Sequence, residues 1–179
     1  MFTLTVSENV SLKLLEQEDA AELFSLVNDS RTHLREWLPW VDGALSPESY
    51  RPVINMWLSQ FAEHNGFQAG IVYNGQLAGM IGFHKIDWIN KSTSLGYWIS
   101  DRFQGKGIMT DSVRAMIDCA FSTYKLNRIE IRCGVENEKS RAIPERLGFH
   151  LEGIQRDGEF LYDHFHDLAV YSILTRDWK

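Results

Sequence analysis

Hydrophobic positions near the start of the chain change between strand-like and helix-like spacing. Residues 11–15 have the pattern of a short strand, and Asp19 then stands where the N-cap of a helix would be. The predicted helix runs to about Asn28, and its apolar stripe is formed by Ala20, Leu23, Phe24 and Val27. A second helix is predicted to begin near residue 48, after a Ser-Pro pair, and to run toward His64.

The middle and the end of the chain contain most of the predicted strands. Asn74-Gly75 separates two alternating segments and is a strong signal for a two-residue hairpin turn. The predicted strands cover residues 67–73, 76–88, 92–100 and 128–135, with two more between 149 and 178. Helical spacing covers residues 110–124, and a further helix precedes Gly148. This order predicts a single α+β domain over residues 1–179, built on a mixed, largely antiparallel sheet.

Length and composition agree with one globular domain. A chain of 179 residues, 44% of them hydrophobic, can bury one core and is too short for two ordinary enzyme domains. No apolar run approaches the roughly 18 residues of a membrane span, and the start lacks a secretion signal, so we expect a cytoplasmic protein without membrane contact. Cys119 and Cys133 have neither metal-ligand spacing nor the density of a disulfide scaffold, and are interpreted as buried thiols without chemistry.

The charge balance narrows the range of partners. The chain carries 24 acidic and 18 basic residues, which gives a net charge of −6. Nucleic-acid grooves contain clustered lysine and arginine, so we expect no direct nucleic-acid binding. An acidic surface would suit a cationic partner, although acidity is also an ordinary way to stay soluble. The sequence leaves open whether the chain is a monomer or a homodimer.

Residues 99–110 form the most informative segment, which passes from a predicted strand through a glycine turn into a predicted helix. Because Gly105 and Gly107 have no side chains, the backbone there can approach a ligand closely and turn its amides outward. The N-terminus of the helix adds partial positive charge at the same place. The segment therefore suits a pyrophosphate group, and Lys106 could add a cation at its rim.

Two other phosphate-binding loops do not fit this segment. The dinucleotide-binding motif needs a third glycine, and Thr110 stands where that glycine would be. The nucleoside-triphosphate loop, G-x-x-x-x-G-K-[ST], is absent from the sequence. Taken alone, the G-x-G turn is also compatible with an ordinary surface turn at a helix start.

Two blocks of sequence together resemble the GNAT acetyltransferase superfamily. R-x-x-G-x-G at residues 102–107 is similar to the signature [QR]-x-x-G-x-[GA], in the same place between strand and helix. Asn137-x-x-Ser140, followed by Arg-Leu-Gly-Phe at 146–149, resembles the second landmark of that superfamily. The pattern from Glu152 to the end of the chain is similar to the ribosomal-protein alanine N-acetyltransferase branch, with Glu159, Asp167 and Tyr171.

The resemblance implies acetyl-coenzyme A as co-substrate, no metal, and a GNAT-like sheet with two splayed strands flanked by helices. Backbone donors around Trp98 and Ile99 would orient the acetyl carbonyl and stabilise an oxyanion. The amine would then attack directly, without an acyl-enzyme. The residues implied to contact the coenzyme are Trp98, Ile99, Arg102, Gln104, Gly105, Lys106, Gly107, Ile108, Met109, Thr110, Asn137 and Ser140.

Proton transfer is implied for two residues. Glu159 matches the carboxylate proposed as general base in the alanine N-acetyltransferase branch, and Asp157 is its nearest rival. Many superfamily members have a tyrosine seven residues after the landmark Asn, which protonates the departing thiolate. This chain has Pro144 at that position. Proline has no N–H, so it also frees the carbonyl of Ser140 from its helical hydrogen bond. Ser140 is then the candidate general acid, or a helix-start residue that contacts only backbone or coenzyme.

Other candidates for chemistry carry weaker signals. His164 and His166 share one strand face, but without further clustered ligands a solvated strand is favoured over a metal site. Trp37 and Trp40 are expected to approach an acceptor pocket. The expected function is acetylation of a primary amine, foremost the N-terminal α-amine of a ribosomal or other protein. The alternatives are a small-molecule acetyltransferase, for a polyamine or an aminoglycoside, and a non-catalytic acetyl-coenzyme A binding module.

Overall fold

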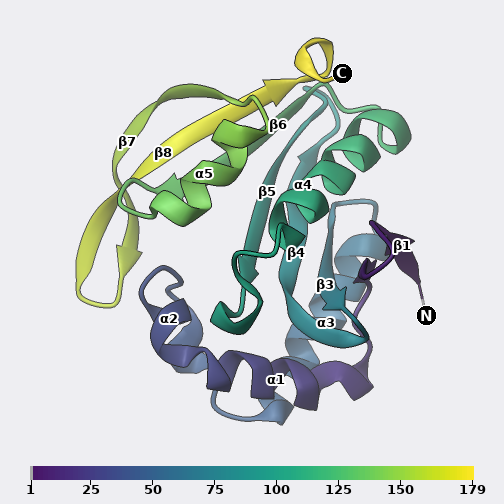
Figure 1. Ribbon diagram of the computed structural model, residues 1–179, viewed down its shortest axis with the longest axis vertical. Coiled ribbons are helices and arrows are strands. Elements are labelled where there is room, and N and C mark those ends of the chain that lie inside the picture. The colour runs from purple at the N-terminus through teal and green to yellow at the C-terminus, as the bar shows by residue number, and fades with distance from the viewer. Residues whose placement is uncertain (1) are drawn as a thin grey trace.

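The computed structural model describes residues 2–179, which form one eight-stranded sheet with helices on both faces (Figure 1). The strands are β1 (Thr3–Thr5), β2 (Val10–Lys13), β3 (Phe67–Tyr73), β4 (Gln76–Asp87), β5 (Ser92–Ile99), β6 (Arg128–Gly134), β7 (His150–Leu161) and β8 (His164–Leu174). The helices are α1 (Ala20–Asp29), α2 (Arg31–Arg35), α3 (Pro47–Ala62), α4 (Ile108–Asp118) and α5 (Glu138–Arg146).

The sheet is mixed and largely antiparallel, as predicted. Its strand order is β1-β2-β3-β4-β5-β6-β8-β7, and only the β5–β6 pair is parallel among the described strands. In Figure 1, α4 and α5 lie in front of the sheet and α3 lies behind it, beside α1. Apolar side chains from the sheet and from the helices on both of its faces are fully buried, among them Leu23, Val27, Ile54, Ile71, Ile81, Phe83, Val113, Met116 and Ile117. Burial of each such side chain contributes about 1.5–3 kcal/mol.

Most predicted elements are present with small shifts at their ends. Asn74 and Gly75 form the predicted turn between β3 and β4, with φ of 49° and 78°. The helix predicted over residues 110–124 begins earlier, at Ile108, and continues beyond Asp118 in a π-helical turn, Cys119–Thr123. β1 and α2 were not predicted, because three exposed residues and a five-residue helix are too short to show a period.

Asp19 is the N-cap of α1, as predicted, but its side chain makes no hydrogen bond to the amides of this helix. The carboxylate of Asp19 instead accepts hydrogen bonds from the backbone amide of Glu16, at 2.8 Å, and from the ammonium of Lys13, at 2.6 Å. The bond from Glu16 is part of a capping box at a 3-10 turn, Gln17–Asp19, that runs directly into α1. The signal for a helix start was correct, but the carboxylate reaches back toward the strand and not forward into the helix.

The strands β5 and β6 separate part-way along the sheet. They pair only where Ser92–Ser94 lie beside Arg128–Glu130. Beyond that point β5 continues to Ile99 beside β4, whereas β6 continues beside β8 as far as Gly134. Along the opening, the backbone groups of β5 and β6 that face each other are therefore not paired by the sheet. No helix in the described part of the chain is both long and apolar enough to cross a membrane.

Candidate active site

A cavity of about 1960 Å³ lies where β5 and β6 separate. Its walls come from α4 and α5 on one face of the sheet and from α1, α2 and α3 on the other. Nearly all the residues predicted for the site line this one cavity: Trp37, Trp40, Trp98, Ile99, Gln104, Gly105, Lys106, Gly107, Ile108, Met109, Thr110, Asn137, Ser140 and Glu159. The fold thus brings the glycine loop, the α5 block and the terminal hairpin together.

Arg102 lies outside the cavity, in contrast to the expectation from the signature. It belongs to a 3-10 turn, Asp101–Phe103, that turns Phe103 inward and leaves Arg102 exposed. The guanidinium of Arg102 lies 5.4 Å from the centre of the Phe103 ring. The side chain of Arg102 is therefore not part of the cavity wall.

The glycine loop has the backbone geometry that the sequence indicated. Gly105 and Gly107 have φ of 74° and 78°, in the left-handed region that favours glycine, and Gly107 is the N-cap of α4. A Cβ added to Gly105 would meet no atom within 4 Å, and one added to Gly107 would meet only Asp111, at 3.9 Å. The space above the loop is therefore open, and the first amides of α4 face it.

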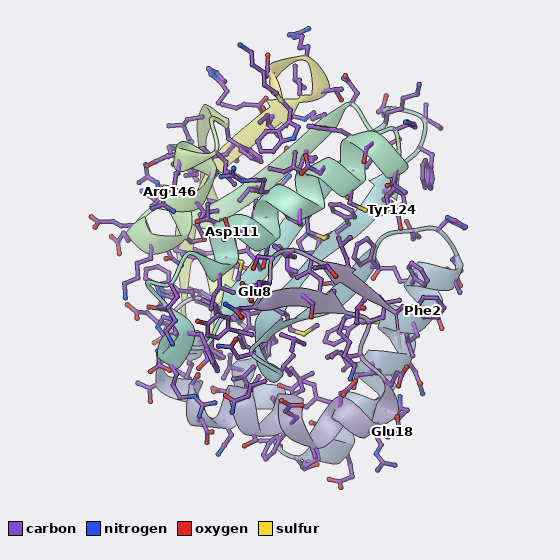
Figure 2. All side chains as sticks on the ribbon, turned by 45° about the vertical axis from the view of Figure 1, so that its right-hand side comes forward. Phe2, Glu8, Glu18, Asp111, Tyr124 and Arg146 are labelled. Atoms are coloured by element: carbon purple, nitrogen blue, oxygen red, sulfur yellow. The ribbon has the colours of Figure 1, made fainter. Side chains whose placement is uncertain are left out.

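Hydrogen bonds fix both ends of the loop. At its start, the hydroxyl of Ser30 donates to the buried hydroxyl of Ser100 at 2.7 Å, which joins the end of α1 to the end of β5. At its end, Arg146 Nη1 of α5 donates to the hydroxyl of Thr110 at 2.8 Å. Figure 2 labels Arg146 and, one residue after Thr110, Asp111 on these two neighbouring helices. The loop is thus held from two sides before any ligand binds.

Gln104 links the two walls of the cavity above the loop. Its amide oxygen accepts from Lys139 Nζ of α5 at 3.0 Å. Its amide nitrogen lies 2.7 Å from Nε2 of His33 on α2, so that ring nitrogen accepts and the other nitrogen of the neutral ring carries the hydrogen. His33 is therefore part of the cavity wall.

Tyr97 of β5 bridges the opening between the sheet and α5. Its hydroxyl donates to the carbonyl of Ser140 at 2.9 Å. That carbonyl lacks a helical partner because Pro144, four residues later, has no N–H. Burial raises the pKa of the Tyr97 phenol well above its usual value, so the hydroxyl stays protonated at neutral pH. A tyrosine from the sheet thus completes the helical turn that the proline leaves open.

Replacing Tyr97 by Phe is expected to lower the free energy of unfolding by about 1 kcal/mol, because the Ser140 carbonyl loses its donor. In a Pro144→Ala background, the new N–H can donate to the same carbonyl. The loss caused by Tyr97→Phe should therefore be smaller there. Denaturant unfolding of the four proteins measures both losses, and equal losses in the two backgrounds would contradict this role of the hydroxyl.

Ser140 sits at the first turn of α5, with two defined contacts. Its N–H donates to Oδ1 of Asn137, the N-cap, at 3.1 Å, and its hydroxyl donates to the sulfur of Cys133 at 3.2 Å. Burial raises the pKa of the Cys133 thiol, which keeps it neutral. Cys133 is buried as interpreted, but it lines the cavity next to Ser140. The two side chains place a hydroxyl and a thiol at the wall of the opening.

A bulge in the terminal hairpin directs Glu159 to the cavity. Gln155 pairs with Leu168 and Glu159 with His166, so residues 156–158 of β7 stand opposite a single residue of β8. Within the bulge Asp157 has φ of 48°, and its N–H donates to Oδ1 of Asp167 at 2.8 Å. Glu159 emerges from the bulge with 35% of its side chain exposed, and it lines the cavity. Asp157, its rival, is exposed and does not line it.

Aromatic side chains form the wall on the α3 face. The rings of Trp40 and Trp98 have centroids 6.0 Å apart. The segment between α2 and α3 that carries Trp37 and Trp40 is held by the hairpin turn, where the Tyr162 hydroxyl donates to the carbonyl of Leu38 at 2.5 Å. The guanidinium of Arg35 stacks 3.9 Å from the centre of the Tyr162 ring. The hairpin therefore supports one wall and supplies Glu159 to another.

His164 and His166 differ, although they share a strand face. His164 is 62% exposed and bonds Asp163, whereas the His166 side chain is only 16% exposed and contacts Glu159. The expectation of a solvated strand thus holds for His164 and is wrong for His166. The sequence carried one usable signal: a two-residue turn at 162–163 pairs position 159 with 166. Within residues 2–179, no group of three or more His, Cys, Asp or Glu could hold a metal ion.

Comparison with known proteins agrees with this arrangement. A family model described as "Acetyltransferase (GNAT) domain" matches residues 9–150. YdaF of Bacillus subtilis (strain 168), named provisionally as a ribosomal N-acetyltransferase, is 43% identical over 180 residues, which cover 100% of this chain and 98% of YdaF. The ribosomal-protein-serine acetyltransferase of Escherichia coli (strain K12) is 31% identical over 172 residues, and the match covers 95% of each chain.

Two solved structures with the same fold contain acetyl-CoA or coenzyme A. The microcin C7 self-immunity acetyltransferase MccE, solved with acetyl-CoA and AMP, has a TM-score of 0.91, at 28% identity and 94% coverage of both chains. RimL, a ribosomal L7/L12 α-N-protein acetyltransferase solved with coenzyme A, has a TM-score of 0.93, at 28% identity and coverage of 97% of this chain and 98% of RimL. The chain therefore belongs to the GNAT family and is an acetyl-CoA-dependent N-acetyltransferase.

Proposed function

We propose that the acceptor is the N-terminal α-amine of a protein, foremost a ribosomal protein, and that the amine attacks acetyl-CoA directly in a ternary complex. One observation carries this proposal: a single cavity joins the glycine loop on one face of the sheet to Glu159 and an aromatic wall on the other. Two co-substrates can thus meet in the opening from opposite sides. The ribosomal acceptors named for the relatives support this choice of substrate class.

In this proposal, backbone groups bind the coenzyme. Its pyrophosphate would lie on the amides of residues 104–110, at the N-terminus of α4. The pantetheine would run along the unpaired edge of β5. The N–H of Ser100 donates to the carbonyl of Ala78 in β4. Because backbone N–H groups point alternately to the two sides of a strand, the amides of Tyr97 and Ile99 point away from β4, toward the opening. These two amides are the candidate oxyanion donors, and the amide of Trp98 is directed to β4.

The cost of deprotonation favours an α-amine as acceptor. An α-amino group with a pKa near 7.8 costs about 1 kcal/mol to deprotonate at pH 7, whereas a lysine near 10.4 costs roughly 4 to 5 kcal/mol. Among the described residues of the hairpin, Glu159 is the carboxylate that lines the cavity. We assign it as the general base, acting directly or through one water. A partly exposed carboxylate of this kind suits deprotonation of an α-amine, which costs less free energy than deprotonation of a lysine.

Ser140 is proposed to donate a proton to the departing thiolate. Because a thiol has a pKa near 8.5, this donation is a modest contribution, and Ser140→Ala is expected to lower kcat by about tenfold. The dissociation constant of coenzyme A should move by less than about 1 kcal/mol. Ser140→Thr, which keeps a hydroxyl, is the matched control and should retain most of the activity. If Ser140→Ala changes the dissociation constant and leaves kcat alone, Ser140 is a coenzyme ligand and not an acid.

An acceptor screen tests the proposed function. Initial rates of coenzyme A release are compared for peptides with a free N-terminus, the same peptides with a blocked N-terminus, spermidine and an aminoglycoside. We expect kcat/KM for free peptides to exceed that for the other amines by at least about tenfold, with no rate for blocked peptides. Faster turnover of a polyamine would select the small-molecule alternative, and spermidine is the acceptor named for a 24% identical relative. If none of these amines causes release of coenzyme A, the non-catalytic binding module is favoured.

A further inference from the structure

His166 and Glu159 form a cross-strand pair beside the cavity. They stand opposite each other in the β7–β8 register, immediately after the bulge. Nε2 of His166 lies 2.9 Å from Oε2 of Glu159. An ionised carboxylate can only accept, so Nε2 carries the hydrogen and donates it. Glu159 lines the cavity, whereas His166 does not, so the imidazole contacts the carboxylate from behind.

We infer that His166 is the positioning residue for Glu159, which rests on the proposed role of Glu159 as the base. Glutamate has freely rotating side-chain bonds, and 35% exposure of this side chain means that packing does not fix it. The bond to His166 restrains Oε2. No hydrogen bond to Oε1 is present within residues 2–179, so that oxygen is available to a water or an amine. Restraining one oxygen while leaving the other free is what a general base requires.

The surroundings of His166 hold its ring in place. His166 pairs with Glu159 of β7, and the N–H of Val135, just after β6, donates to the carbonyl of the adjacent Asp167 at 3.0 Å, so the backbone at His166 is held from both sides. A Cβ added to Gly134 of β6 would lie 3.0 Å from Cε1 and 3.1 Å from Nδ1 of His166. The absence of a side chain at Gly134 is therefore what makes room for the imidazole. With 16% of its side chain exposed, His166 has little freedom to leave this position.

Replacing His166 by Gln or by Asn tests whether the hydrogen bond to Glu159 matters, as distinct from the presence of the imidazole ring. Gln at position 166 can place an N–H near the position of Nε2, whereas the shorter Asn places its N–H near Nδ1, too far from Glu159. We expect His166→Asn and His166→Ala to lower kcat by at least about tenfold, with the dissociation constant of coenzyme A unchanged within about twofold. His166→Gln should retain activity within about threefold of the wild type. His164→Ala, two residues away on the same strand and 62% exposed, is the control and should have no effect.

A double-mutant cycle with Glu159→Gln completes the test, with thermal melts to show that each variant is folded. If His166 acts through Glu159, then His166→Ala should cause less than about a twofold further loss in the Glu159→Gln background. Full activity of folded His166→Ala together with a large loss in Glu159→Gln would overturn only the role of His166. Equal losses in His166→Gln and His166→Ala would also overturn positioning. A small effect of Glu159→Gln itself would instead remove the base on which the inference rests.

Discussion

Replacing Glu159 by Gln is expected to lower kcat by about 100-fold or more, while coenzyme A binds with unchanged affinity. Gln has the same shape and can still accept a hydrogen bond from His166, but it cannot take a proton from the amine. The rate should be measured with a peptide acceptor from about pH 6 to about pH 9. The coenzyme dissociation constant is measured separately by calorimetry, because KM would combine binding with turnover.

Asp157→Asn is the matched control for Glu159→Gln, because Asp157 lies in the bulge of β7 directly before Glu159 and only Glu159 lines the cavity. Asp157→Asn should leave kcat within about twofold of the wild type. A loss of less than about threefold for Glu159→Gln across the whole pH range would make Glu159 structural. A large loss for Asp157→Asn in the same assay would transfer the role of base to Asp157.

Gly107→Val is expected to abolish measurable binding of acetyl-CoA. In the unliganded chain a Cβ at this position has open space around it, with Asp111 Oδ2 the nearest atom at 3.9 Å. The added atoms would therefore not displace protein but would occupy the space proposed for the pyrophosphate. Calorimetry with coenzyme A should show a loss of at least about 100-fold in affinity, which corresponds to about 2.7 kcal/mol.

A second left-handed glycine controls for backbone strain. Gly75, in the β3–β4 turn, has φ of 78°, the same as Gly107, and a Cβ there would also meet no atom within 4 Å. Valine at a positive φ is strained at either position, so Gly75→Val should lower stability in a similar way. It should leave coenzyme binding unchanged, because Gly75 lies outside the cavity. Unchanged affinity in folded Gly107→Val would remove the loop from the coenzyme site.

The helix and strand content could be predicted largely from local pattern. Segments with a clear period, such as β3 and β4 around Asn74-Gly75, were found where expected because the turn residues and the alternation both act within a few residues. The contacts of single side chains were instead decided by neighbouring elements. The carboxylate of Asp19 bonds backward to Glu16 and Lys13, and the side chain of Arg102 is turned outward by a 3-10 turn that also buries Phe103.

The glycine loop was determined by the sequence alone. The absence of Cβ atoms permits the positive φ observed at Gly105 and Gly107, within a single strand-turn-helix segment. The loss of a helical hydrogen bond at Ser140 was also predictable, because the missing N–H of Pro144 is a property of that residue. These features need no partner from elsewhere in the chain.

The partners across the opening were decided only by the tertiary structure. Nothing near Pro144 in the sequence indicated that the hydroxyl of Tyr97 would take the freed carbonyl, and nothing near Glu159 indicated on which face its carboxylate would emerge. In a strand each additional residue reverses the face of the next side chain. The pairing of Glu159 with His166 follows from the turn at 162–163, but the position of the two side chains beside the cavity depends on how the hairpin packs against the rest of the sheet.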